Sequence, residues 1–159
     1  MPRRIDHVAI IVRNIEQALV FYRDTLGITP SEIKDVPTEQ VRIALRRHIT
    51  QRYIGPNRAI SALIAHPELE DALRQALRGA GQSGQVAVDP QLLQRVVADI
   101  RAVRDEAGGG FARAVLLCSM DIRRHLRKLI EGEFFELPVL SFQELSGDVP
   151  VVPLGQVRG

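Results

Sequence analysis

The feature that most limits the fold of this chain is an alternation of apolar runs and an amphipathic segment in its last third. Residues 114 to 118 are apolar, residues 121 to 131 carry apolar side chains at helical spacing, and residues 139 to 142 are apolar again except for Ser141. Short apolar runs predict buried strands, whereas a 3.6-residue period predicts a helix. A strand–helix–strand segment of this length predicts two parallel strands joined by a right-handed crossover. A final strand is predicted over residues 149 to 152.

The middle of the chain is predicted to be mainly helical. Apolar side chains recur at every fourth position between residues 38 and 53, which predicts an amphipathic helix. A strand is predicted over residues 59 to 65, and Pro67 then occupies the first position of another helix. Asp89 and Pro90 together form an N-cap and a proline at the first helical position, so a further helix is predicted to begin there.

The N-terminal segment predicts a separate strand–helix unit. The apolar run from Ile5 to Val12 predicts a strand, Asn14 is placed to cap the following helix, and Gly27 is placed to end it. We therefore predict an α/β protein with an N-terminal strand–helix unit, a helical middle segment and a small βαβ-type sheet subdomain. The expected domain boundaries are residues 1–40, 41–110 and 111–159.

Composition excludes several classes of protein. The chain of 159 residues has one cysteine, so neither an internal disulfide nor a cysteine-based zinc cluster is possible. The formal net charge of +2 is too small to predict nucleic-acid binding unless the charges gather on one face, and no nucleic-acid partner is expected. No segment reaches the roughly 18 apolar residues of a membrane helix, so no membrane segment is expected in this chain. A reducing, cytoplasmic location is expected.

Two sets of residues are candidates for chemistry. His7 is the best candidate for a metal ligand, but a divalent metal needs several convergent ligands, and a histidine on a sheet face is the simpler interpretation. Cys118 and His125 suggest a nucleophile and a base without a third orienting group. A cysteine at the end of an apolar run is more often a small buried hydrophobe. We expect no catalytic residue, no cofactor and no bound metal.

Charged residues gather at three places. Two are the basic groups Arg46-Arg47-His48 and Arg123-Arg124-His125, the second with Arg127-Lys128 close behind it. No glycine-rich phosphate loop accompanies either, so solvated or carboxylate-paired arginines are the simpler interpretation. Contact with an acidic partner protein or a neighbouring subunit is the functional alternative. The third group, Glu68 with Glu70 and Asp71, follows Pro67 and is interpreted as acidic charge that complements the helix dipole.

The predicted helix over residues 121 to 131 has a definite phase. Leu126, Leu129 and Ile130 are expected to be buried against the strand at residues 114 to 118, whereas Arg127 is expected on the outer face.

The segments IDHVAIIVRNIEQALVFYRDTLGI and SEIKDVPTEQVRIA lie within residues 1 to about 44. They resemble the start of methylmalonyl-CoA epimerases, members of the glyoxalase-like vicinal oxygen chelate family. In that family the histidine that matches His7 is a metal ligand. The resemblance therefore implies a metal-binding role for His7 only if the epimerase interpretation describes this chain.

Residues from about 39 to 157 carry another set of motifs, in this order: EQVRIALRRHITQRY, ISALIAHPELEDALRQAL, VLLCSMDIRRHLRKLIEGEFFELPVLSFQEL and VPVVPLGQV. They resemble the C-terminal cytosolic part of the major export-gate protein of type III secretion and flagellar systems, the FlhA/LcrD/InvA family. The stretch from DIRRHLRKLIE to LPVLSFQEL is the most specific. The two resemblances overlap at VRIA, which fits both.

The export-gate resemblance implies a protein-transport module and not an enzyme. It implies a location at the cytosolic face of the bacterial inner membrane. The expected partners are other subunits of a nine-membered ring, secretion chaperones, export substrates and a gatekeeper protein. Two alternatives stay open: a metal-dependent epimerase or lyase of the vicinal oxygen chelate type, and an inert chimera of the two families.

Overall fold

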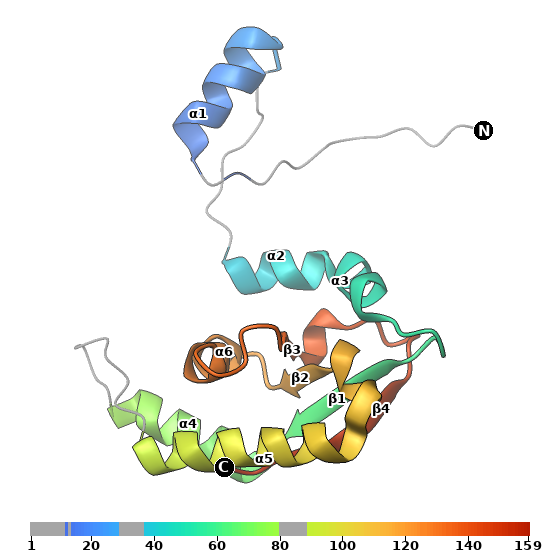
Figure 1. Cartoon of the computed structure of the whole chain (residues 1–159). Coiled ribbons are helices and arrows are strands. Elements are labelled where there is room, and N and C mark those ends of the chain that lie inside the picture. Colours follow the sequence, from blue (N-terminus) through green and yellow to red (C-terminus); the bar gives the residue numbers. More distant parts are fainter. Residues whose placement is uncertain (1–11, 13, 29–36, 80–88) are drawn as a thin grey trace. The chain divides into compact units, whose positions relative to one another are not determined.

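Figure 1 shows the computed structural model of the chain, which describes residues 12, 14–28, 37–79 and 89–159. The chain forms two compact units, Met1–Val36 and Pro37–Gly159.

The described part of the first unit is the helix α1 (Ile15–Leu19) followed by a π-helical segment, η1 (Val20–Thr25). Asn14 caps α1, because its Oδ1 accepts a hydrogen bond from the Gln17 amide at 3.0 Å. Gly27 follows with a φ of 68°, the left-handed conformation that favours glycine after a helix. The predicted start and end of this helix are thus confirmed. The strand was predicted over Ile5 to Val12, and all of these residues except Val12 lie outside the described ones.

The second unit begins with two helices, α2 (Thr38–Ala44) and α3 (Arg46–Tyr53), where one continuous helix was predicted. The chain departs from helical geometry at Leu45, with φ −87° and ψ 8°. The bend has a packing reason. It lets α3 place Ile49 and Tyr53 on the sheet, while α2 reaches the 3-10 turn η4 (Phe142–Glu144).

A four-stranded sheet forms the centre of the second unit. Its strands are β1 (Ile60–Ala65), β2 (Val115–Cys118), β3 (Val139–Ser141) and β4 (Val151–Val157). All neighbours are parallel, in the order β3-β2-β1-β4. The helices α4 (Pro67–Gly79) and α5 (Pro90–Ala107) and the 3-10 turn η3 (Gly108–Arg113) connect β1 to β2, and α6 (Arg123–Ile130) connects β2 to β3.

Helices cover both faces of this sheet (Figure 1). Because side chains alternate along a strand, Leu63 and Leu116 face a core shared with α4, α5 and α6, whereas Ala62 and Val115 face a second core shared with α3. Strands buried on both faces are apolar throughout, which explains the continuous apolar runs in the sequence. The predicted α/β fold class is confirmed.

The domain boundaries predicted at residues 1–40, 41–110 and 111–159 remain a prediction. The structure divides the chain between residues 36 and 37, and the sheet of the second unit draws strands from both of the last two ranges. β1 lies at the inside of the sheet, between β2 and β4. No helix among the described residues is long and apolar enough to span a bilayer.

The phase predicted for α6 is confirmed for two residues. Leu126 and Ile130 are fully buried, and Leu129 is partly buried against the same core. Arg127 was predicted on the outer face, but it is half-buried. Its guanidinium donates hydrogen bonds to the backbone carbonyls of the following loop: Leu137 and Phe135 at 2.9 Å and Phe134 at 3.3 Å. The side chain therefore holds the loop between α6 and β3.

Candidate functional site

A buried glutamate joins three parts of the second unit. Glu144, in η4, is fully buried, and its carboxylate accepts two hydrogen bonds from Arg42 of α2. Arg42 Nε donates to Oε1 and Nη2 donates to Oε2, each at 2.8 Å. Arg123, at the start of α6, approaches the same carboxylate, with its Nε 3.1 Å from Oε1. A bidentate arginine–carboxylate pair is strong and directional, so Glu144 fixes α2 against η4, and its ion pair with Arg123 adds α6 to the cluster.

The environments of these two arginines differ. The hydrogen bond to Glu144 raises the pKa of Arg42, whereas burial lowers the pKa of Arg123, whose side chain is only 10% exposed. Glu39 of α2 lies 3.8 Å from Arg123 Nη2 and 3.9 Å from Arg124 Nε. Two guanidinium groups thus surround one buried carboxylate, and a second carboxylate at the rim balances their charge.

An open cleft of about 680 Å³ lies between α3 and the loop of residues 146–149. Among its lining residues are the three arginines that we use to name it the basic cleft: Arg46 and Arg47 of α3, and Arg58 in the turn before β1. Asp148 is the one acidic residue that lines it, so three arginines and one aspartate give these residues a net charge of +2.

The wall of the basic cleft is held in place by a side-chain contact. Thr50 of α3 is 2% exposed, and its Oγ1 accepts a hydrogen bond from the Ser146 amide at 2.8 Å. The hydroxyl of Ser146 is itself buried and has no hydrogen-bond partner in the described part of the chain. Ile54 and Val149 also line the cleft and add apolar surface.

The arginines of the basic cleft are open to solvent. Arg46, Arg47 and Arg58 are exposed, and none forms an ion pair with another described residue. Of the basic groups noted in the sequence, Arg46-Arg47-His48 is therefore solvated, whereas Arg123 is buried and paired. The two arginines of the group Arg123-Arg124-His125 differ in burial, because the side chain of Arg124 is 70% exposed.

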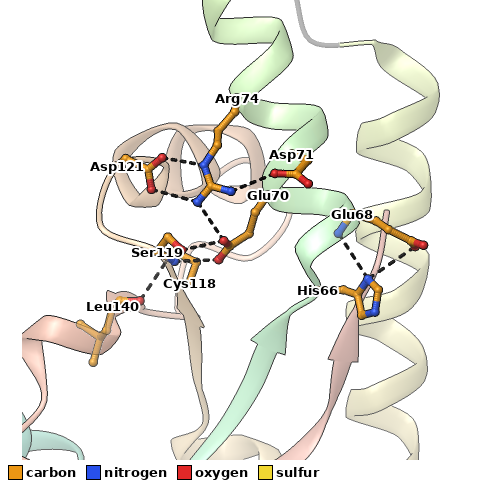
Figure 2. A network of polar contacts seen from close by, with 9 residues as sticks. All are labelled: His66, Glu68, Glu70, Asp71, Arg74, Cys118, Ser119, Asp121 and Leu140. Atoms are coloured by element: carbon orange, nitrogen blue, oxygen red, sulfur yellow. Dashed lines mark hydrogen bonds and ion pairs between the residues drawn. The ribbon is translucent and has the colours of Figure 1, made fainter.

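A second polar network lies where β1 and β2 end (Figure 2). Glu70, in the first turn of α4, accepts hydrogen bonds from the amide and hydroxyl of Ser119 at 2.7 and 2.6 Å. Arg74 donates to Glu70 at 3.0 Å and to Asp121 at 2.7 and 3.2 Å. Its Nη1 also donates to Asp71 at 3.1 Å.

This network occupies the carboxyl edge of the sheet, where parallel α/β folds commonly bind ligands. Here the carboxylates are engaged by the chain itself, and Arg74 lowers the pKa of Asp121. The network pins α4 to the loop after β2. The interpretation of Glu70 as a charge that complements the helix dipole missed this contact, because Ser119 is 49 residues away in sequence.

The pairing of Cys118 with His125 as nucleophile and base finds no support in the geometry. Cys118 is fully buried, and its thiol faces the carbonyl oxygen of Leu140, at 3.7 Å (Figure 2). Burial raises the pKa of the thiol to about 12, so it stays protonated at neutral pH. The Nδ1 of His125 is buried without a partner among the described residues.

His7 lies outside the described residues. Within the described ranges, no group of three or more histidine, cysteine, aspartate and glutamate side chains is arranged to hold a metal ion. At the start of α4, His66 Nδ1 accepts a hydrogen bond from the Glu68 amide at 3.3 Å, so this imidazole acts as a helix cap (Figure 2).

Sequence reasoning missed the central residue of the first cluster. Glu144 pairs with Arg42, a residue 102 positions earlier. The available signal was a single acidic residue within the largely apolar stretch that surrounds η4. The partner of such a residue is set by tertiary packing, so the pattern alone does not name it.

Comparison with known proteins gives a consistent result. The FHIPEP family model matches residues 8–150. Low calcium response locus protein D of Yersinia pestis is 34% identical over 120 residues, which cover 76% of this chain and 17% of that protein. Protein hrpC2 of Xanthomonas euvesicatoria is 31% identical over 158 residues, covering 98% of this chain and 23% of that protein.

Solved structures agree with these relatives. The nonameric EPEC SctV-C superimposes with a TM-score of 0.66 at 32% identity and covers 90% of this chain and 41% of that chain. CdsV of Chlamydia pneumoniae, in its complex with CdsO, also superimposes with a TM-score of 0.66 at 32% identity. The match covers 76% of this chain and 35% of that chain.

These matches also bear on the N-terminal segment. The family model begins at residue 8, and the Xanthomonas relative aligns over nearly the whole chain. The resemblance of residues 1 to 44 to methylmalonyl-CoA epimerases, and with it the idea of a chimera, therefore receives no support.

Proposed function

Since the chain belongs to the FHIPEP family, we propose that it acts as a protein-docking part of the cytosolic domain of a type III secretion export gate. The family match over residues 8–150 carries this proposal. The resemblance of residues 39 to 157 to the C-terminal cytosolic part of export-gate proteins is confirmed by the relatives and the structural neighbours. The chain spans less than a quarter of the length of the curated relatives described above.

The proposed partners are proteins. The EPEC neighbour is nonameric and the Chlamydia neighbour forms a complex with CdsO, which supports contact of this chain both with copies of itself and with other components. Export substrates, secretion chaperones and a gatekeeper protein are the partners we propose. The proposed location is the cytosolic face of the bacterial inner membrane. We propose no catalytic role, since relatives in this family are named as secretion proteins.

Self-association tests the first part of this proposal. We expect the purified chain to be monomeric at micromolar concentration and to associate weakly above it, because in free solution the subunits are not tethered to a common surface that would raise their local concentration. We expect the association to weaken with salt, because exposed charges are screened within about 10 Å at 0.1 M ionic strength. Sedimentation velocity across protein concentration and ionic strength measures both effects. A chain that stays monomeric at every concentration and salt contradicts this expectation.

A further inference from the structure

We propose that the basic cleft is a docking site for an acidic peptide segment of a partner protein. The proposal rests on the proposed role in protein docking and goes further by naming the surface and the chemistry of the occupant. It is carried by charge, by the shape of the cleft and by the conformation of Arg58.

The charge of the cleft favours an anion. Arg46, Arg47 and Arg58 are exposed and form no ion pair within the described ranges, and Asp148 offsets only one of them. Arginine presents planar, directional donors that match carboxylates. Arg42, by contrast, is already occupied by Glu144. The cleft arginines are therefore available to carboxylates from outside the chain.

The conformation of Arg58 adds a second observation. Its φ of 58° places it in the left-handed region, and it is the one non-glycine residue of the described chain with a positive φ. This conformation costs an ordinary residue roughly 1 kcal/mol, and glycine or asparagine would avoid most of that cost. The turn is closed by hydrogen bonds from Arg58 to Gly55 at 3.0 Å and from Gly55 to Ala59 at 2.8 Å. The presence of arginine at this position is explained if its side chain contacts a ligand in the cleft.

The size and lining of the cleft favour a peptide over a small anion. About 680 Å³ is far more than one phosphate fills, and it lies in the usual range of ligand pockets, roughly 300–1,000 Å³. Ile54 and Val149 offer apolar surface to aliphatic side chains. The lining holds no aromatic side chain on which a nucleotide base could stack.

The cleft is also held in shape before anything binds. Thr50 ties α3 to the loop through its contact with Ser146, and Glu144, two residues before Ser146, is fixed by Arg42 and Arg123. A site whose walls are already ordered loses less entropy on binding than one that must fold around its ligand.

The experiment is a titration with a fluorescein-labelled octapeptide of alternating glutamate and leucine, followed by fluorescence anisotropy at 50 mM salt. The test variant is the triple change Arg46→Gln, Arg47→Gln and Arg58→Gln. The matched control is Arg78→Gln, Arg95→Gln and Arg113→Gln, which removes the same charge from exposed arginines outside the cleft. Circular dichroism and urea unfolding establish that both variants fold.

We expect saturable binding that the cleft variant weakens at least tenfold and the control variant by less than about threefold. A peptide with glutamine in place of glutamate should not bind. Equal weakening by both variants, or no binding up to 1 mM peptide (roughly −4 kcal/mol), would overturn the assignment. Displacement of the peptide by equimolar ATP or inorganic phosphate would also overturn it, in favour of a small-anion site.

The two proposals fail separately. If the peptide does not bind but sedimentation velocity shows the expected self-association, the cleft is misassigned and the export-gate role stands. If the peptide binds to the cleft of a chain that never self-associates, the cleft assignment stands and the role as a ring subunit fails.

Discussion

Changing Glu144 to glutamine will destabilise the unit of residues 37–159 by about 3 kcal/mol in urea unfolding at neutral pH. The carboxylate is fully buried and binds Arg42 at two points, with Arg123 Nε a further 3.1 Å away. A glutamine of the same shape cannot accept both Arg42 hydrogen bonds and leaves only Glu39, at the rim, to offset the charge of two guanidinium groups. We expect the lower end of the range for broken buried ion pairs, because the side chain of Arg42 is 30% exposed.

Glu39→Gln is the matched control for this change. The carboxylate of Glu39 is 24% exposed and lies 3.8 Å from Arg123, so its loss should cost less than about 1 kcal/mol. Similar losses from the two variants would show that burial of Glu144 is not what makes its ion pairs important. A Glu144→Gln protein as stable as the parent would contradict the account of this cluster.

Changing Leu126 to alanine will cost about 2–5 kcal/mol, the usual range for removing a large apolar side chain from a packed core. Leu126 is fully buried in the core that α6 shares with β2 and α5. Thermal or urea unfolding measures the loss, and the position of Leu126 on α6 makes it a test of the phase of this helix.

Arg124→Ala provides the comparison on the same helix. The side chain of Arg124 is 70% exposed, so its removal should change stability by no more than about 0.5 kcal/mol. Arg127 is unsuitable as an exposed control, because its guanidinium holds three backbone carbonyls. Equal losses from Leu126→Ala and Arg124→Ala would mean that the helix packs through a different face.

Local pattern was enough to predict most elements of the last third of the chain. The run at residues 114–118, the apolar spacing on α6 and the run at residues 139–142 together predicted β2, α6 and β3, because each signal lies within a short segment. The central place of β1 was not predictable in this way. About fifty residues separate β1 from β2, and nothing in the sequence of either strand identifies the strand that it pairs with.

The same limit applies to the candidate site. The sequence showed the exposed arginines of α3 and offered contact with an acidic partner as their functional alternative. It did not show that Arg58 and residues 146–149 would join them around one cleft. Nor did it separate Arg123 from Arg124, which are adjacent in sequence but differ in burial because only Arg123 points at Glu144.

The central claim is that this chain is a subunit of an export-gate ring that binds other proteins. It is tested most directly by imaging the chain on a nickel-chelating lipid bilayer, bound through an N-terminal histidine tag. Tethering to one surface raises the effective concentration of the subunits. EPEC SctV-C, which is nonameric, serves as the positive control. The account predicts closed, nine-membered rings at high surface density that disperse as salt is raised. Separate particles or open filaments at saturating density, on bilayers where the control forms rings, would contradict it.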